Sequence, residues 1–423
     1  MKIKRKLAAA VLAGLICLPA AAGAQAAGGS SAVTTAQAKT GQAGQEGYKT
    51  DLMRRIRNII QGQEKTADDA DELAKIQAAG LNQSLSRWAM DSRDEGGTLI
   101  FSDSPEYVPE NGILYRDSVK GDARVLFYHL NNTNEPKKLA VVLKNEYKGT
   151  NKVLVTRGGS GQPSSAYLEV GKATQLEYFS QERHDQILLP PAMSRLLQED
   201  MNETILQPGQ LTYGVFDFHA EHSVLVTVLM LDAYGDPVTA AESLPVLPKD
   251  EMRLRGTFKG MNRVLTARKS YDPAKDGGVY FMLADDKQDK YRYGVDATDG
   301  SQVINYGNYG INYRLELPVI AGQVKYYLSP LGGVYAGAIR SYQNKKAFTL
   351  YPTPNGRTYF GDNTAPESYE EQVKREAGSW HIARNTELAN LGETSQRGEM
   401  VFEFSPPGAS NLPVAIVMVP DNK

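Results

Sequence analysis

Short apolar segments separated by turn residues recur along most of this 423-residue chain and constrain its fold more than any other feature. Such segments, rich in Val, Ile, Leu and aromatic residues, favour β-strands, and clusters of Gly, Pro and Asn between them favour tight turns. Turn signals stand at 131–134, 158–159 and 208–209. The pattern predicts strands at 125–130, 139–143, 153–156, 224–231, 252–258, 264–267, 279–283, 313–319, 324–328, 348–351, 400–404 and 414–419.

This spacing predicts a mainly β protein with two tandem antiparallel β-sandwich-like domains, 96–247 and 248–423. Pro245 and Pro248 mark the boundary between them. Two short helices are predicted inside these mainly β domains. One is at 189–203, which has apolar residues at helical spacing, and the other is at 364–377, which has a Glu-rich middle after an early proline.

The segment 48–95 before the first domain has a helical pattern. Its apolar residues fall on one helical face, and Thr66 followed by two aspartates suits a helix N-terminus. Leu85 and Trp88 continue the apolar face. We expect a helical hairpin or a broken helix, which would serve for docking or oligomerisation.

The first 26 residues resemble a cleavable signal peptide. A basic start is followed by an apolar run at 7–18, too short for a comfortable membrane span, and then by small residues. Cys17 is the only cysteine and lies inside this run, so the mature chain would contain neither a thiol nor a disulfide. The segment 27–47 is Ala, Gly, Ser, Thr and Gln-rich, which predicts a flexible linker. We therefore expect a secreted protein or one of the extracytoplasmic cell envelope.

The charge balance excludes some partners. The 49 acidic residues outnumber the 47 basic ones, and removing the four basic residues of the signal peptide gives a net charge of −6. No basic patch that would favour nucleic acid is evident, and no later apolar run has the length of a transmembrane helix. The expected partners are cell-wall polysaccharide or another envelope protein.

Tyrosine is the unusual feature of the composition, with 23 Tyr against 11 Phe and 2 Trp. Tyrosines and asparagines concentrate in 304–313. Tyrosine rings combine an apolar face with a polar tip, and asparagine offers both a donor and an acceptor, so together they suit sugar or protein contact. A tight turn with strand-forming tyrosines explains the same residues. The candidate ligand-binding residues are Asn305, Tyr306, Asn308, Tyr309, Asn312 and Tyr313.

No catalytic residue and no cofactor are predicted from motifs. The sequence lacks a Gly-x-Ser-x-Gly nucleophile turn, a phosphate-binding loop, a dinucleotide fingerprint and a His-Glu-x-x-His helix. Asp217, His219 and Glu221 alternate along a predicted strand and would lie on one face, where they form a weak candidate for a metal site. A solvated strand end explains them better.

Four segments together resemble uncharacterised exported proteins of Gram-positive-related bacteria: 213–218 (Tyr-Gly-Val-Phe-Asp-Phe), 308–314, 331–338 and 408–414. Some of those relatives carry copper amine oxidase-like N-terminal domains. The resemblance covers 100–423 and implies a location and a fold rather than a chemical activity.

The sequence favours a non-catalytic binding or scaffold protein that recognises a polysaccharide or a protein surface through exposed Tyr and Asn loops. The alternative is an extracytoplasmic polysaccharide hydrolase whose carboxylates cannot be identified from spacing. A purely structural envelope protein is a third possibility. A groove with two facing carboxylates would favour the enzyme, and a flat tyrosine-rich face would favour the binder.

Overall fold

The computed structural model describes residues 84–180, 182–319, 322–331, 334–343, 348–356, 358–360, 379–381, 388–395 and 397–421, all within one compact unit, Gly62–Lys423. The predicted signal peptide (1–26), linker (27–47), the first part of the helical segment (48–83) and the helical insertion (364–377) lie outside the described residues. No helix in the described ranges combines the length and apolar character needed to cross a membrane.

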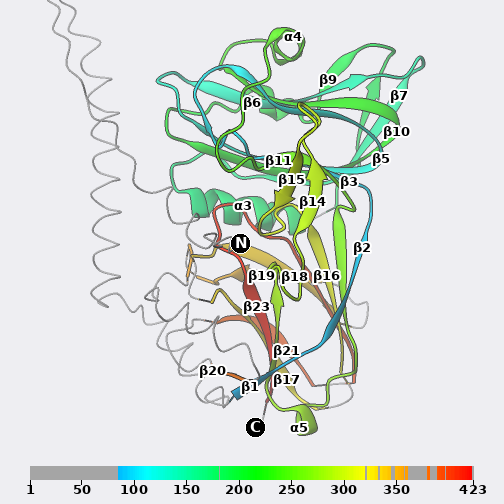
Figure 1. Cartoon of the computed structure of the whole chain (residues 1–423), viewed down its shortest axis with the longest axis vertical. Coiled ribbons are helices and arrows are strands. Elements are labelled where there is room, and N and C mark those ends of the chain that lie inside the picture. Colours follow the sequence, from blue (N-terminus) through cyan, green and yellow to red (C-terminus); the bar gives the residue numbers. More distant parts are fainter. Residues whose placement is uncertain are drawn as a thin grey trace, which may run out of the picture. The chain divides into compact units, whose positions relative to one another are not determined.

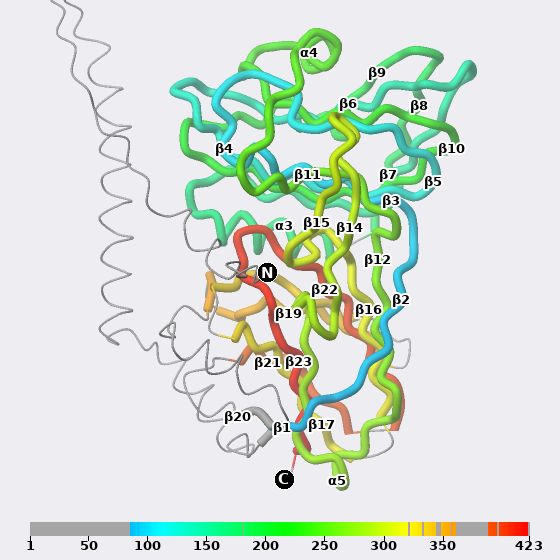
Figure 2. The backbone as a smooth tube through the Cα atoms, in the orientation of Figure 1, coloured from blue at the N-terminus to red at the C-terminus, as the bar shows by residue number. Residues whose placement is uncertain are grey.

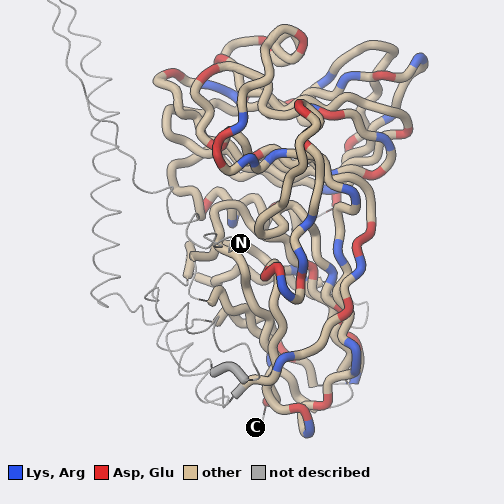
Figure 3. The backbone as a smooth tube through the Cα atoms, in the orientation of Figure 1, with Lys and Arg blue, Asp and Glu red and all other residues tan. Residues whose placement is uncertain are grey.

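The described chain is mainly β, as predicted (Figure 1). Every predicted strand overlaps an observed one, because runs of β-branched and aromatic residues between turn signals are well suited to pleated, half-buried surfaces. Lys, Arg, Asp and Glu are interspersed along the chain without a large region of one sign (Figure 3).

The first of three sheets has 11 described strands. Its bounds are β3 (Thr98–Ser102), β4 (Tyr107–Val108), β5 (Gly112–Asn131), β6 (Lys137–Asn145), β7 (Asn151–Ser160), β8 (Asp185–Leu189), β9 (Ser194–Leu196), β10 (Leu211–Asp232), β11 (Arg255–Lys259), β14 (Arg292–Val295) and β15 (Gln302–Asn305). The long strands β5 and β10 pair along most of their length, with register shifts between Ala220 and Val224 and between Val228 and Leu229. Both halves of β5 contribute to one buried cluster, so the curved sheet encloses its own core.

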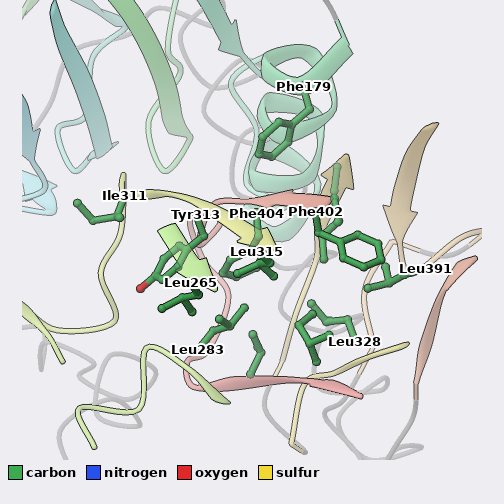
Figure 4. Packing of buried hydrophobic residues seen from close by; sticks show 14 of the residues in the cluster. Phe179, Leu265, Leu283, Ile311, Tyr313, Leu315, Leu328, Leu391, Phe402 and Phe404 are labelled. Atoms are coloured by element: carbon green, nitrogen blue, oxygen red, sulfur yellow. The ribbon is translucent and has the colours of Figure 1, made fainter. Parts of the chain in front are cut away.

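The second and third sheets face each other across a separate core (Figure 4). The second contains β20 (Ser379–His381), β1 (Ser84–Arg87), β13 (Val279–Leu283), β23 (Val414–Pro420), β17 (Val324–Ser329) and β21 (Ala389–Thr394). The third contains β19 (Thr349–Thr353), β18 (Gly337–Gln343), β22 (Gly398–Phe404), β16 (Asn312–Val319), β12 (Asn262–Ala267) and β2 (Met90–Glu95). Leu283 and Leu328 from the second sheet and Leu315 and Phe402 from the third lie in this core.

Helix α3 (Tyr167–Ser180) connects the two regions. It packs against β7 and β10 of the first sheet and against β18 and β19 of the third. Phe179 of α3 belongs to the core between the second and third sheets (Figure 4). Sequence analysis did not predict this helix, because its buried face includes Gly171, Thr174 and Gln175 and so has no clear apolar stripe. The smaller helices are α4 (Pro237–Ser243), α5 (Pro273–Asp276) and the 3-10 helix η2 (Glu199–Asn202).

The structure departs from two helical predictions where it describes them. Within 48–95, residues 84–87 and 90–95 form β1 and β2, because Leu85 and Trp88 become buried while β1 pairs with β13 and β2 pairs with β12. Within 189–203, a turn at Pro190 separates β8 from β9, and only η2 is helical. Strand pairing has overridden local helical periodicity in both places.

The chain passes between the sheets in a way that local patterns do not reveal (Figure 2). It leaves β1 and β2 to enter the first sheet at β3, and parallel pairs form at β1–β13, β3–β5, β4–β5 and β12–β16, among mostly antiparallel ones. Strands β11, β14 and β15 lie beyond residue 248 yet join the first sheet. The division into domains 96–247 and 248–423 stays a prediction.

Candidate functional site: a tyrosine face beside two carboxylates

Most of the six candidate ligand residues have internal partners. Asn305 is buried, and its side-chain amide donates to the carbonyl of Tyr309 at 2.7 Å while its Oδ1 accepts from the Tyr309 amide at 2.9 Å. Asn308 is buried with a φ of 53°, a conformation that asparagine tolerates, and its Nδ2 donates to the Tyr313 hydroxyl at 2.7 Å. These asparagines hold the loop in shape.

Tyr313 is fully buried, and its hydroxyl donates to Asp289 Oδ2 at 2.6 Å. Asn312 is half-buried on β16. Tyr309 is also half-buried and donates to the carbonyl of Ser410 at 2.6 Å. Tyr306 is 39% exposed. The expectation that the whole loop presents exposed contacts is therefore corrected: Tyr306 is accessible, whereas Asn305, Asn308 and Tyr313 are structural, because their polar groups are used inside the protein.

Tyr306 belongs instead to a larger surface on the hairpin of β14 and β15. Strand residues alternate between two faces, and Tyr293 is paired with Ile304. Tyr291 and Tyr306 continue the pairing, with ring centroids 5.8 Å apart and planes at 82°. Tyr293 is 66% exposed and Val295 is 47% exposed. We call this outer surface, formed by Tyr291, Tyr293, Val295, Ile304 and Tyr306, the tyrosine face.

The opposite side of the hairpin is packed against the protein. Val303 is 4% exposed, and a Cβ on Gly294 would lie 2.6 Å from Cδ1 of Phe258. The hairpin is thus anchored by its inner residues, while the aromatic side chains on its outer side are not required to fill the core. A fixed backbone with accessible rings is a preorganised contact surface.

Two carboxylates lie near the same loop. Asp103 and Glu106, which we call the carboxylate pair, follow β3 in the chain, and Tyr128 of β5 and Tyr309 are close enough to be influenced electrostatically by both. Tyr128 is half-buried, and its ring packs edge-on against Tyr213 with centroids 5.9 Å apart. Tyr309 follows Tyr306 by three residues and also interacts electrostatically with Tyr291. Tyr309, in the loop 305–311 that follows the tyrosine face, is therefore influenced electrostatically by the carboxylate pair.

The backbone of the carboxylate pair is fixed by long-range hydrogen bonds. The Asp103 amide donates to the carbonyl of Leu254 at 3.0 Å, and the Glu106 amide donates to Asp250 Oδ2 at 2.8 Å. The Glu106 carbonyl accepts from the Leu130 amide at 2.8 Å. These contacts bind the β3–β4 loop to two segments distant in sequence.

Both carboxyl groups resist ionisation. Burial, followed by repulsion from Asp250, raises the pKa of Glu106 from 4.5 to about 7. Burial, with repulsion from Glu106 and Asp250, raises the pKa of Asp103 well above its ordinary value. Oδ1 of Asp103 is shielded from solvent and has no hydrogen-bond partner among the described residues. Perturbed pKa values concentrate at functional sites.

Replacing Glu106 by Gln is expected to reduce the pH dependence of stability. Because the folded pKa exceeds the unfolded one, the stabilisation from protonated Glu106 is complete below about pH 4.5 and is lost as pH rises through about 7. We expect the wild type to lose about 2 kcal/mol more than Glu106→Gln between pH 5 and pH 8, after discounting for partial exposure. Denaturant unfolding at both pH values measures this, with the exposed neighbour Glu110→Gln as control. Equal pH dependence in wild type and Glu106→Gln would contradict the assignment.

The three candidate metal ligands on β10 do not form a metal site, and two of them interact with other side chains of the protein. Asp217 accepts from Nε and Nη2 of Arg124 at 2.6 and 2.8 Å and from the Tyr178 hydroxyl at 2.9 Å. His219 Nδ1 lies 2.7 Å from Oδ1 of Asp122, and Glu221 is exposed. The described ranges hold no grouping of three or more His, Cys, Asp or Glu side chains suited to a metal ion. The three candidates lie on one face, as predicted, but Asp217 is directed to an arginine.

A separate open cavity of about 620 Å³ lies between β8, β9 and η2. Its lining mixes both signs of charge, since it includes Arg183 and Arg195 as well as Glu199 and Asp200. Arg183 is already paired with Asp185 at 2.8 Å. The lining therefore selects no ligand charge, and the cavity is a weaker candidate than the tyrosine face.

Comparison with known proteins assigns no family, since neither a family model nor a curated protein matches the chain. Similar solved structures are PNGF-II (11% identity, TM-score 0.16), a Paenibacillus xanthan lyase (8%, 0.14) and the β-porphyranase BpGH86A of glycoside hydrolase family 86 from Bacteroides plebeius (9%, 0.15). The matches cover 80%, 79% and 74% of this chain, and 65%, 25% and 37% of those proteins. TM-scores this low carry no argument about function, so the comparisons leave the protein characterised by its β-rich architecture alone.

Proposed function

We propose that this protein is an exported, non-catalytic binding protein of the cell envelope that holds a polysaccharide chain against its tyrosine face. The observation that carries the proposal is a hairpin whose inner side is packed and whose outer side exposes Tyr293, Val295 and Tyr306. Exposed clustered aromatic residues on a rigid support are typical of recognition surfaces. The proposed location rests on the signal-like N-terminus and on the resemblance to exported bacterial proteins.

A polysaccharide suits this surface better than a purely apolar partner. Each tyrosine offers a flat apolar ring for the C–H face of a sugar and a hydroxyl for the sugar's own hydroxyl groups. Tyr291 and Tyr293 are two residues apart, about 6.8 Å along an extended strand. That spacing is comparable with the size of one sugar ring, so neighbouring rings would contact neighbouring sugars.

Removing the two most useful rings is expected to weaken binding without unfolding the protein. Tyr293→Ala combined with Tyr306→Ala should lose about 2 kcal/mol, or about 30-fold in Kd, if each aromatic contact is worth about 1 kcal/mol. The measurement is retention of purified protein on isolated cell-wall polysaccharide and peptidoglycan, followed by titration against the retained material. Tyr313→Ala would be uninformative, because it empties a buried position.

The control is Tyr234→Ala, since Tyr234 is 92% exposed and lies outside the tyrosine face. We expect this control to bind like the wild type. Equal binding by the double variant and the wild type would contradict the proposal, and so would the absence of retention by any protein. Release of reducing sugar ends by the wild type would instead support the alternative hydrolase, for which Glu106 is the candidate acid because its pKa is raised to about 7.

A further inference from the structure

Gln302 is a polar side chain on the same side of the β14–β15 hairpin as the tyrosine face. It is paired across the two strands with Val295, and Tyr293 is paired with Ile304. Directly paired residues point to the same face of a sheet, and so do residues two apart along one strand. The burial pattern agrees, because Gln302 is exposed whereas its neighbour Val303 is buried. The aromatic surface therefore has a carboxamide beside it.

The carboxamide of Gln302 is available to a ligand. Its oxygen and nitrogen make no hydrogen bond with any residue that the structure describes. Asn305 on the same strand differs, because its amide oxygen and nitrogen are both bonded to the backbone of Tyr309. A free carboxamide offers a donor and an acceptor side by side. Gln302 can thus bind two neighbouring groups of a ligand without giving up a contact inside the protein.

The hairpin 292–305, all of which the structure describes, offers no unpaired charge to a ligand. Its charged side chains are Arg292, Asp296 and Asp299. Arg292 pairs with Asp94, and Lys249 Nζ lies 3.3 Å from Oδ2 of Asp296 and 2.6 Å from Oδ2 of Asp299. A charged ligand on this surface would lose water from its charge without gaining a counter-charge. The surface therefore favours a neutral ligand.

The strand register places the carboxamide at the edge of a sugar that stacks on Tyr293. Gln302 is the diagonal neighbour of Tyr293 across the strand pair, and such neighbours are about 7–8 Å apart. A sugar whose hydroxyls are all equatorial has flat C–H faces for stacking and carries its hydroxyls around its edge. Hydroxyls on adjacent ring carbons then match the donor and acceptor of the carboxamide.

We propose that Gln302 is the hydrogen-bonding residue of the tyrosine face and that this surface takes a neutral glycan with equatorial hydroxyls, such as a β-linked glucose polymer. This inference rests on the proposed function and names the class of polysaccharide. The rings of Tyr293 and Tyr306 supply the apolar contact, and the carboxamide fixes the orientation of the sugar on them. Gln302 thus determines specificity, whereas the rings supply affinity.

Two oligosaccharides test this inference: cellohexaose, a linear chain of β-linked glucose, and its counterpart oxidised to carboxylates at the primary hydroxyls. In titrations the wild type is expected to bind neutral cellohexaose more tightly. Gln302→Met keeps the length of the side chain but removes the carboxamide, and it should weaken cellohexaose binding about three- to tenfold, the value of one neutral hydrogen bond. The control Gln186→Met, at an exposed position on β8, should bind like the wild type.

A second variant tests specificity through a gain of affinity, which misfolding cannot produce. Gln302→Lys places a cation at the position of the carboxamide and should reverse the preference in favour of the carboxylated ligand. An unreversed preference in Gln302→Lys would overturn the inference. So would equal affinity of the wild type for both ligands, or cellohexaose binding by Gln302→Met as tight as that of the wild type.

The outcomes separate this inference from the proposed function. If the wild type binds neither oligosaccharide but is retained on cell-wall polysaccharide, the glycan class and the role of Gln302 are rejected and the proposed function stands. If Tyr293→Ala/Tyr306→Ala is retained as well as the wild type, the proposed function itself is rejected, and this inference with it.

Discussion

Asp217→Ala is expected to lower the free energy of unfolding by about 3–5 kcal/mol, because it leaves the guanidinium of Arg124 buried without its counter-charge. The Arg124 side chain is 1% exposed, and Asp217 accepts from both its Nε and its Nη2. The pKa of Arg124 stays above its ordinary value although burial opposes its charge, since Asp217 stabilises that charge. The loss therefore exceeds that of an ordinary surface contact.

Arg124 also joins parts of the fold that are far apart in sequence. Its Nη1 donates to the carbonyls of Met261 and Gly310 at 2.6 and 2.9 Å, so the first sheet is connected to the β11–β12 turn and to the 305–311 loop. Disturbing Arg124 would release the loop that carries Tyr306 and Tyr309. The matched control is Asp122→Ala, which breaks the exposed pair with His219 and should cost less than about 1 kcal/mol. Similar losses in both variants on denaturant unfolding would contradict this account of Arg124.

Gly159→Ala is expected to displace helix α3 and to cost about 3 kcal/mol, the upper range for overpacking a core. A Cβ at Gly159 on β7 would lie 2.5 Å from the carbonyl oxygen of Thr174 and 2.7 Å from the amide nitrogen of Tyr178. Both are backbone atoms of α3, so no rotamer change relieves the clash. Tyr178 would move away from Asp217, which weakens the same buried network.

Hydrogen exchange of the α3 amides, together with denaturant unfolding, measures the effect. We expect faster exchange across α3 and a lower unfolding midpoint. Gly235→Ala is the control, because its nearest new neighbour is a leucine side-chain atom at 3.2 Å. Unchanged protection of α3 in Gly159→Ala would show that the helix and the sheet are not in the close contact described.

Most strands could be predicted from the sequence because the residue types within each segment already favour a strand. Segments such as 279–283 and 414–419 are apolar, β-branched and bounded by turns, and they form β13 and β23. Segment 84–95 could not be assigned locally, since Leu85 and Trp88 fit a helical face as well as a strand. Pairing with β13 and β12, about 180 residues away in the chain, decided the outcome.

The candidate site could likewise be predicted only in part from the sequence. Composition drew attention to 304–313, and Tyr306 lies on the tyrosine face, but composition cannot tell an exposed ring from a buried one such as Tyr313. Tyr291, just before β14, and Tyr293 in β14 were missed although the two residues are separated by strand spacing. Asp103 and Glu106 had no local signal, because their raised pKa values come from burial in the folded chain and from Asp250, which lies in a separate segment.

The most direct test of the tyrosine face is hydroxyl-radical footprinting of the protein with and without the retained polysaccharide. If the polysaccharide lies where we propose, oxidation of Tyr293 and Tyr306 falls severalfold on binding, while Tyr234, exposed elsewhere, is oxidised at an unchanged rate. Equal protection of all three tyrosines, or protection confined to residues outside the β14–β15 hairpin, would contradict the assignment of this surface as the binding site.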